Sequence, residues 1–277
     1  MKQLKTLPDD IFHLFDPKLT HVPSEDNLEE FARNAKDILR TRLTEREPLD
    51  NPLRFSALGK QDRQIWYMSR HTPQEDMTPK TYFKFLYGDI IELLVLFLAK
   101  EAGHDVHSEQ LEVEVDGVKG HIDAIIDGVV VDVKSAAPYG YQKFERQTVV
   151  EDDPFGYVAQ LAGYSNVLNK GKSAAWVAFD KVGGDICVST LSSSIINDHK
   201  PEDRIAYLKE VIAQKDPPPR CYDPKPDGKS GNMMLSTGCS YCAFKYSCYK
   251  DLQVYAYSNG PRYLTKVVKI PDVPRIH

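Results

Sequence analysis

The stretch GHIDAIIDGVVVDVKS, residues 120–135, decides the fold that we predict for this chain. Two short runs rich in β-branched residues flank Asp127-Gly128. Asp-Gly between such runs is the strongest short-range signal of a β-hairpin with a two-residue turn. The sequence therefore predicts a hairpin in which Ile126 pairs with Val129.

This register determines which polar side chains lie together. Counted back from the turn, Asp123 lies opposite Asp132, and His121 lies opposite Lys134. The Asp123–Asp132 pair falls on a non-hydrogen-bonded position, where side chains approach most closely. Because side chains alternate along a strand, both Asp residues and Lys134 are expected on one face. The other face is apolar and carries Ile122, Ala124, Val131 and Val133.

Two opposed carboxylates repel each other, which costs stability. A divalent cation such as Mg²⁺ removes that cost, because hard cations prefer carboxylate oxygens. The adjacent Lys134 could orient a water molecule or stabilise charge on a phosphate oxygen. The alternative is a solvated polar face on an edge hairpin, and this stretch alone leaves both interpretations open.

Length and composition bound the class of protein. The chain has 277 residues, 42% hydrophobic and 27% charged, which suits one large α/β domain or one domain with appendages. The net charge of −5 gives no global basic field, although a local groove can still be basic. No apolar run is long enough to span a bilayer, and the N-terminus lacks the apolar core of a signal peptide. We therefore expect a cytoplasmic protein with no membrane partner.

The pattern along the chain predicts three regions: a helical lead-in over residues 1–52, an α/β core over 53–216 and a cysteine-rich segment over 217–277 that docks on the core. Within them we expect a long helix from Pro79 to about Gly103 and a meander over 109–134 whose strands are joined by two Asp-Gly turns, Asp116-Gly117 and Asp127-Gly128. We also expect a loop over 138–150, a helix from Asp153 to about Leu168, strands over 173–179 and 185–190, and a helix over 201–215.

One carboxylate in the long predicted helix is conspicuous. Glu92 lies among Leu, Ile and Phe residues whose density predicts burial on most sides. An unpaired buried charge is costly, so Glu92 needs a partner. That partner is a metal ion or, in the alternative, a nearby Lys or Arg.

Four elements follow one another in a recognisable order: Gly88-x-x-x-Glu92, Gly120-x-x-Asp123, Asp132-x-Lys134 and Gln160-Leu-x-x-Tyr164. Between about Ser56 and Cys248, the chain resembles the PD-(D/E)XK nuclease superfamily, specifically its RecB-like exonuclease branch. This resemblance implies a restriction-endonuclease-like α/β fold, with a mixed central sheet flanked by helices.

The resemblance also implies roles for the matching positions. Asp123, Asp132 and the backbone carbonyl of Val133 would hold Mg²⁺ or Mn²⁺, and Lys134 would position or activate the attacking water. Gln160 and Tyr164 would support the site and contact the DNA backbone. Glu92 stands where many RecB-like enzymes have a metal-binding His, so the chain departs from the pattern there with an oxygen ligand. The cationic residues expected to contact DNA are Lys143, Arg146 and Arg63.

The cysteines suggest a second metal site. Cys239-x-x-Cys242, followed after five intervening residues by Cys248, resembles the late cysteine group of RecB-like exonucleases that carry an iron–sulfur cluster. Those enzymes take a fourth cysteine from a segment before the core, where this chain has Gln61. We therefore expect Cys221 as the fourth ligand of a 4Fe–4S cluster, with a structural Zn²⁺ as the alternative. The remaining Cys187 is expected to be a core residue of a strand.

These features predict a metal-dependent DNA exonuclease that acts on linear ends, single- or double-stranded. The compact chain looks like stand-alone bacteriophage exonucleases, which process DNA ends for recombination or degrade host DNA. That likeness implies recombination or replication proteins as partners and the host cytoplasm as location. Three alternatives stay open: an endonuclease on the same fold, a catalytically inactive DNA-binding or assembly module, and a metal-dependent hydrolase of other substrates.

Overall fold

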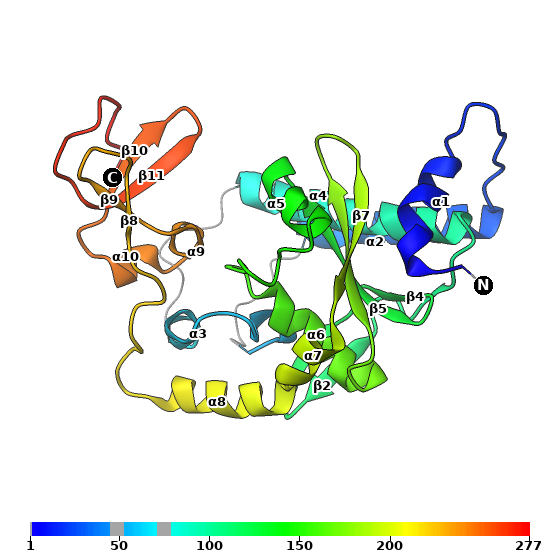
Figure 1. The fold of residues 1–277 in the computed structure, drawn as a ribbon, viewed down its shortest axis with the longest axis horizontal. Helices are drawn as coiled ribbons and strands as arrows, with labels where there is room; N and C mark the ends of the chain where they lie inside the picture. The colour runs from blue at the N-terminus through cyan, green and yellow to red at the C-terminus, as the bar shows by residue number, and fades with distance from the viewer. Residues whose placement is uncertain (1, 45–52, 71–78) are drawn as a thin grey trace. The chain divides into compact units, whose positions relative to one another are not determined.

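The computed structural model describes residues 2–44, 53–70 and 79–277 (Figure 1) and divides into two compact units. The first unit consists of residues 1–59 and 77–205, and the second of residues 60–76 and 206–277. The predicted boundary at residue 52 lies outside the described residues, and the boundary near 216 stays a prediction. Among the helices that the structure describes, none combines the length and the apolar character needed to cross a membrane.

A five-stranded sheet forms the centre of the first unit. Its strands, in spatial order, are β1 (Val106–His107), β4 (Ala124–Ile126), β5 (Val129–Ala136), β6 (Ala174–Asp180) and β7 (Ile186–Leu191). The β5–β6 pair is parallel and the other pairs are antiparallel. The predicted mixed sheet of an α/β fold is therefore confirmed.

The Asp-Gly hairpin forms as predicted. Ile126 pairs with Val129, and the two turn residues, Asp127 and Gly128, have φ values of 50° and 79°. Two consecutive positive φ values define a type I′ turn, whose twist matches that of the flanking strands. The turn chemistry of the sequence thus fixed the register correctly.

The hairpin ladder is shorter than expected, because it ends at the Ala124–Val131 pair. The expected backbone pair of Asp123 with Asp132 is therefore absent from the ladder. The first half of the meander forms its own two-stranded sheet of β2 (Glu112–Val115) and β3 (Val118–His121).

In that small sheet His121 pairs with Glu112, so the expected His121–Lys134 pair is wrong. The physical reason lies at Asp123, whose carboxylate accepts the N–H of Val133 at 2.6 Å. This side-chain hydrogen bond replaces the next backbone hydrogen bond of the β4–β5 ladder.

Helices cover both faces of the central sheet. One face packs against α1 (Leu7–His13) and α4 (Pro79–Glu101) in a single apolar cluster. The β5 and β6 residues in that cluster are Val131, Val133, Ala175 and Val177. The strands also contact α5 (Pro138–Glu145) and α6 (Tyr157–Asn169).

Two expectations about these helices need correction. The expected loop over 138–150 contains helix α5, which has Pro138 in its first turn and buries Tyr141 and Phe144. Proline suits a first helical turn because its missing N–H has no partner there in any case. Helix α6 begins at Tyr157 and not at Asp153, because the Asp153 carboxylate accepts backbone N–H groups at the helix start.

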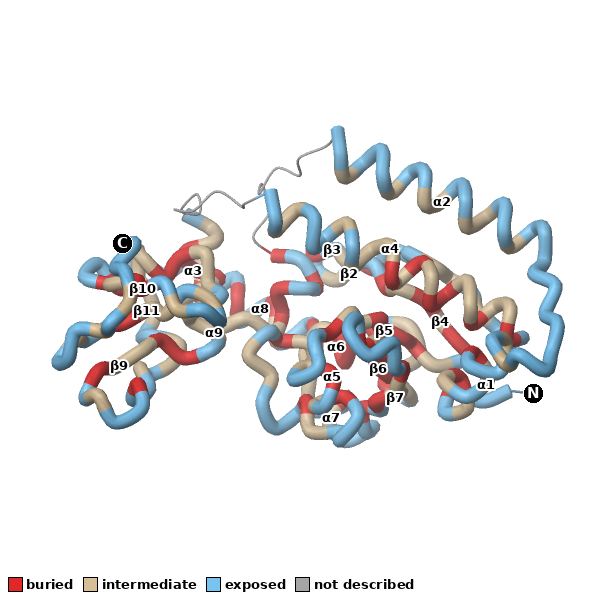
Figure 2. The backbone as a smooth tube through the Cα atoms, turned by 90° about the horizontal axis from the view of Figure 1, so that it is seen from above, coloured by how far each residue is buried: buried red, intermediate tan, exposed pale blue. Residues whose placement is uncertain are grey.

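The lead-in contains the short 3₁₀ helix η1 (Leu4–Thr6), α1 and the expected helix α2 (Glu25–Thr44). Figure 2 shows α2 as exposed or half-buried along its length, and none of its residues is buried. The helix attaches to α4 through an Arg42–Asp89 ion pair at 2.5 Å and the Phe31–Phe97 ring contact at 5.2 Å. The unit also includes η2 (Phe55–Ala57) and α7 (Ser193–Asp198).

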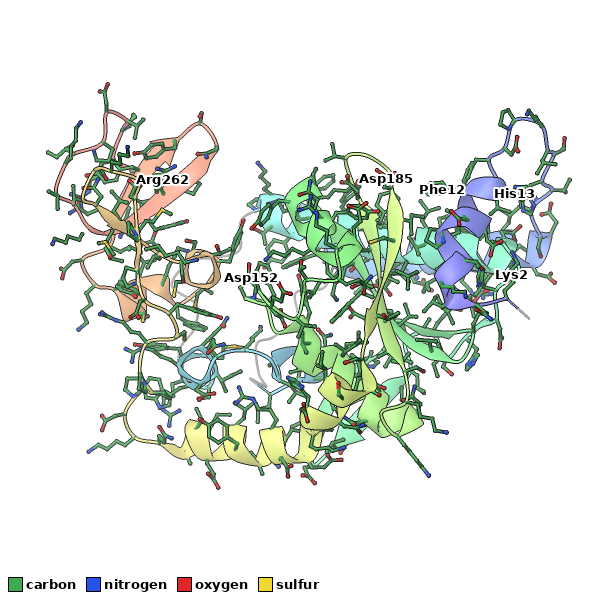
Figure 3. The ribbon with its side chains drawn as sticks, viewed as in Figure 1. Lys2, Phe12, His13, Asp152, Asp185 and Arg262 are labelled. Atoms are coloured by element: carbon green, nitrogen blue, oxygen red, sulfur yellow. The ribbon has the colours of Figure 1, made fainter. Side chains whose placement is uncertain are left out.

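The second unit combines short helices with a small sheet. Its helices are α3 (Asp62–Met68), most of α8 (Pro201–Ala213), α9 (Thr237–Ser240) and α10 (Lys245–Cys248). Its antiparallel sheet has the order β10 (Gln253–Tyr257), β11 (Gly260–Lys266), β9 (Met233–Met234) and β8 (Lys225–Pro226). Arg262 extends from β11 and binds Asp227 at 2.6 Å (Figure 3). An apolar cluster of Trp66, Tyr67, Val211 and Phe244 joins α3 to α8 and to the cysteine-rich segment.

Candidate active site and cysteine pocket

The predicted catalytic pair of β5 lies in the middle of the central sheet. Asp132 is 3% exposed, and its Oδ2 is 2.5 Å from the Nζ of Lys134. Burial on its own would lower the pKa of the Lys134 ammonium, but the Asp132 and Asp123 carboxylates outweigh it and hold this pKa above its ordinary value. Lys134 is therefore a positive charge at neutral pH.

Asp123 and Val133 meet where the hairpin ladder has ended. The Asp123 carboxylate accepts the Val133 N–H on the β4 side of strand β5. The N–H and C=O of one strand residue point to the same side. The carbonyl oxygen of Val133 is therefore directed toward the side on which Asp123 lies, and no β4 residue pairs with it there.

The third predicted carboxylate, Glu92, reaches this region from α4. Burial raises the pKa of Glu92 to about 7, and the nearby Asp132 charge adds to the effect. Burial likewise raises the pKa of Asp123 well above its ordinary value, with further contributions from Glu92 and Asp132. Glu92 and Asp123 thus lie close enough to Asp132 for its charge to disfavour theirs.

The chemistry of this donor set fits a hard divalent cation, which would neutralise the mutual repulsion. In the described part of the chain, however, no three His, Cys, Asp or Glu side chains converge closely enough to hold a metal ion. The carboxylates of Glu92, Asp123 and Asp132 are instead turned toward Gln110, Val133 and Lys134. To bind a cation here, Asp123 would exchange Val133 for the metal and Asp132 would exchange Lys134. Glu92 can keep the Gln110 hydrogen bond on Oε1 and offer its Oε2 to the cation.

Tyr164 and Gln160 of α6 belong to the same region, as the sequence predicted. Tyr164 is 3% exposed, stacks on Phe55 with a centroid distance of 5.0 Å, and is hydrogen-bonded to Gln160. Burial, together with the smaller contributions of the Asp132 and Asp123 charges, raises the pKa of Tyr164 to about 12. The phenol therefore keeps its proton at neutral pH.

The position of Tyr164 also explains a glycine of the sequence motif. A Cβ atom on Gly120 would lie 2.8 Å from the Tyr164 hydroxyl oxygen and 2.5 Å from the Phe55 Cβ. Such distances are too short for a side chain. Gly120 thus lets Tyr164 pass close to β3, a steric role that sequence analysis did not foresee.

The cations expected to contact DNA lie in different places. Lys143 of α5 is paired with the Asp152 carboxylate at 2.5 Å, and Arg146 is exposed just after that helix. Arg63 belongs to the second unit and lines the pocket that holds the cysteines. The structure therefore gives Arg63 a different neighbourhood from the other two.

Sequence analysis missed two residues of the carboxylate site, Gln110 and Tyr157. Gln110 has a φ of 52°, donates its side-chain N–H to Glu92 at 2.7 Å and its backbone N–H to the Asp123 carbonyl at 3.3 Å. Tyr157 places its ring 5.0 Å from the Nζ of Lys134. The spacing of Tyr157, three residues before Gln160, put both on one helix face and could have identified it. The positive φ of Gln110 has no signal in the sequence.

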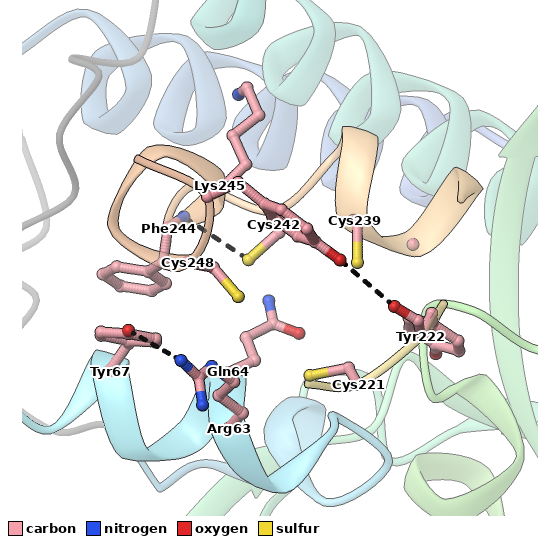
Figure 4. A pocket seen from close by; sticks show the side chains of 12 residues that line it. Arg63, Gln64, Tyr67, Cys221, Tyr222, Cys239, Cys242, Phe244, Lys245 and Cys248 are labelled. Atoms are coloured by element: carbon pink, nitrogen blue, oxygen red, sulfur yellow. Dashed lines mark hydrogen bonds between the residues drawn. The ribbon is translucent and has the colours of Figure 1, made fainter. Parts of the chain in front are cut away.

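The four cysteines predicted as ligands line one pocket of the second unit, together with residues of α3 (Figure 4). Backbone N–H groups donate to three of the sulfurs: Gln64 to Cys221, Tyr222 to Cys239, and Phe244 to Cys242, the last at 3.4 Å. The Gln64 N–H belongs to the first turn of α3, where it has no partner within the helix. Such hydrogen bonds favour thiolates as ligands.

The protonation of the thiols agrees with a site that binds a metal in exchange for protons. Burial raises the pKa of Cys221 to about 11, and burial also raises the pKa of Cys239 and Cys242. The Arg63 guanidinium, which donates to the Pro218 carbonyl at 2.5 Å, is also hydrogen-bonded to Cys248. Such a cation offsets the negative charge of a thiolate-ligated group.

The thiols are gathered but do not converge. Among the described residues, no three cysteines stand at metal-holding distance, and Figure 4 shows the Gln64 side chain directed between their sulfurs. Gln61, which stands where the resemblance led us to expect a cysteine, is the N-cap residue of α3. Cys187 lies in a strand, β7, as predicted, and pairs with Ala178. It is half-buried, so the expectation of a buried core residue is wrong.

Comparison with known proteins identifies no family. No protein-family model matches the chain, and no curated protein matches it. Among solved structures it matches the crystal structure of SSO0001 at 16% identity, over 78% of this chain and 95% of that one, with a TM-score of 0.41. We draw no conclusion about function from a likeness of this size.

Proposed function

We propose that this chain is a metal-dependent DNA exonuclease of the PD-(D/E)XK superfamily, in its RecB-like branch. One observation carries the proposal: Glu92, Asp123 and Asp132 gather around Lys134, and burial together with the neighbouring carboxylates raises the pKa of Glu92 and of Asp123. These residues occur in the order and at the spacing of the superfamily motif. A cluster that is unfavourable without a cation supports a cation-dependent role.

Glu92, Asp123, Asp132 and the Val133 carbonyl would hold Mg²⁺ or Mn²⁺, which supplies a Lewis acid for water activation and for the leaving oxygen. Lys134 is protonated at neutral pH, so it donates a hydrogen bond to the attacking water or to a phosphate oxygen and does not remove a proton. Water attacks phosphorus in line and loses a proton to bulk solvent, the bond to the leaving oxygen breaks, and that oxygen takes a proton from solvent. Tyr164 keeps its hydroxyl proton and can donate it to a phosphate oxygen.

For the second unit we propose a 4Fe–4S cluster held by Cys221, Cys239, Cys242 and Cys248, with Zn²⁺ as the alternative. The support is that all four line one pocket and that three receive N–H donors. The group would be structural. A broad visible absorption band in anaerobically purified protein supports iron, whereas colourless protein with bound zinc contradicts the cluster.

The biological setting rests on the resemblance alone. It comprises a stand-alone bacteriophage exonuclease in the host cytoplasm that acts on linear DNA ends, single- or double-stranded. Recombination or replication proteins are the partners that this setting implies.

The decisive experiment compares end-labelled linear DNA with closed circular DNA, in the presence of Mg²⁺ or Mn²⁺. Loss of linear DNA alone, abolished in Asp132→Ala, supports the exonuclease. Asp116→Asn is the matched control, because Asn-Gly preserves the other type I′ turn. Cleavage of the circle favours an endonuclease on the same fold. An inactive, well-folded, metal-replete wild type favours a DNA-binding or assembly module.

A further inference from the structure

The ammonium group of Lys134 has a second neighbour besides Asp132. Its Nζ lies 5.0 Å from the ring centroid of Tyr157, the first residue of α6. A cation within about 6 Å of an aromatic centroid is attracted by the electron-rich ring face. The Lys134 side chain is long and flexible, so the Asp132 contact alone leaves its direction incompletely defined.

The Tyr157 ring is itself held in place by other rings. Phe155 lies 5.5 Å from it and Phe144 of α5 lies 6.3 Å from it. Phe144 also contacts Trp176 of β6 at 5.9 Å, and Trp176 is the register partner of Asp132. A row of aromatic rings therefore ties Tyr157 to the strand beside the catalytic carboxylate.

The backbone of Tyr157 is fixed as well. Its N–H donates to Asp153 Oδ1 at 3.0 Å, and the same carboxylate accepts the N–H groups of Gly156 and Val158. Helix α6 continues from Tyr157 to Gln160 and Tyr164. Tyr157 thus has a rigid main chain and a rigid ring, which are the properties of a residue that orients another.

We propose that Tyr157 is a positioning residue for Lys134: its ring face holds the ammonium group toward the Asp132 carboxylate, where the scissile phosphate and the attacking water must lie. The inference rests on the proposed nuclease function. The proposed role of Tyr157 requires its aromatic ring and not its hydroxyl group.

The kinetic test compares a substitution that keeps an aromatic ring at position 157 with one that removes it. Tyr157→Leu is expected to lower kcat about tenfold with KM within about twofold, whereas Tyr157→Phe retains a kcat close to that of the wild type. Phe12→Leu is the control, since it removes a partly exposed ring of α1 that belongs to none of the Tyr157 contacts. The effect of Tyr157→Leu should vanish in a Lys134→Gln background, because one residue acts through the other.

A spectroscopic test does not depend on activity. In proton NMR the ε-methylene resonances of Lys134 should be shifted upfield by the ring in the wild type and in Tyr157→Phe, and this shift should disappear in Tyr157→Leu. The same spectra report whether each variant is folded.

Several results overturn the inference: an equal kcat loss in the Lys134→Gln background, a Tyr157→Phe variant as slow as Tyr157→Leu, or a Lys134 resonance without the upfield shift. A wild type that cleaves no DNA overturns the proposed nuclease function itself. An active wild type with an unaffected Tyr157→Leu variant overturns only the role of Tyr157.

Discussion

The carboxylate site and the cysteine pocket gather their side chains in opposite ways. Asp123, Asp132 and Lys134 come from or beside strands of a five-stranded sheet, and Glu92 comes from a 23-residue helix. The cysteines come from loops and from helices of four residues. The carboxylate site lies on a sheet and a helix whose stability does not depend on a bound metal. Its crowded negative charges lower the stability of the metal-free fold. The cysteine pocket is surrounded by little regular structure, so the metal group that we propose for it would become part of its stability.

The largest expected effect is the loss of the group bound by the cysteines. Cys242→Ser should remove most of the bound metal and unfold the second unit, because ligand binding in such sites contributes on the order of 10 kcal/mol. Metal analysis and limited proteolysis, with the cleavage sites mapped, would measure both effects. We expect new cleavage within residues 206–277 and a first unit that stays resistant.

Cys187→Ser is the matched control, because Cys187 lies in β7 outside the pocket. It should leave metal content and proteolysis unchanged. A metal-free Cys242→Ser protein with an intact second unit would contradict the difference proposed between the two sites, since the bound group would then be dispensable for folding.

At the carboxylate site, by contrast, removing one charged side chain should stabilise the metal-free protein. The folded-state pKa of Glu92, about 7, is above its ordinary value of 4.5, so its stabilising contribution is complete below pH 4.5 and is lost as the pH rises through 7. In metal-free protein, Glu92→Gln should therefore raise the free energy of unfolding at about pH 8 by about 2–3 kcal/mol, with little change at about pH 4. The same variant should bind Mn²⁺ more weakly.

Urea unfolding at both pH values measures this effect. Glu114→Gln, a substitution at an exposed carboxylate of β2, should change the free energy by less than about 0.5 kcal/mol. A Glu92→Gln variant that is less stable than the wild type at pH 8 would mean that the carboxylates do not repel one another.

A smaller effect is expected at Gln110, which connects Glu92 to the backbone of Asp123. Gln110→Asn preserves a residue that tolerates the positive φ but shortens the reach of the amide. Removal of such an outer hydrogen bond should weaken Mn²⁺ binding about tenfold. Calorimetric titration measures it, and an unchanged affinity would show that Glu92 needs no help in positioning.

The smallest effect concerns the surface cations of the first unit. Arg146→Ala should reduce the slope of log K against log salt for DNA binding by about one, as expected for one lost phosphate contact. Lys143→Ala should change the slope less, because Lys143 is already paired with Asp152. Fluorescence anisotropy over a range of salt concentrations would separate the two, and a larger change for Lys143 would contradict this order.

Features encoded by neighbouring residues were predictable from the sequence. Both Asp-Gly turns, the register at Ile126–Val129 and the long helix from Pro79 to Glu101 follow from turn chemistry and apolar spacing. The motif order also identified Gln160 and Tyr164, which the fold brings close to the carboxylates.

Features that depend on distant partners were not predictable. The ladder ends early because the Asp123 side chain takes the Val133 N–H, and α5 forms where a loop was expected because Tyr141 and Phe144 are buried. Arg63 lies among cysteines that are far away in the sequence. None of these contacts leaves a signal within a short window of residues.

Gly156, the N-cap residue of α6, lies in main-chain contact with Gly59, and this contact limits how the chain can vary. A Cβ on Gly156 would lie 2.5 Å from the carbonyl carbon of Gly59, and a Cβ on Gly59 would overlap the Gly156 main chain. A side chain at either position would therefore collide with the main chain of the other. A mutational library that randomises either codon alone should return glycine almost exclusively among folded clones, and accepted changes should require a compensating shift of the opposite main chain.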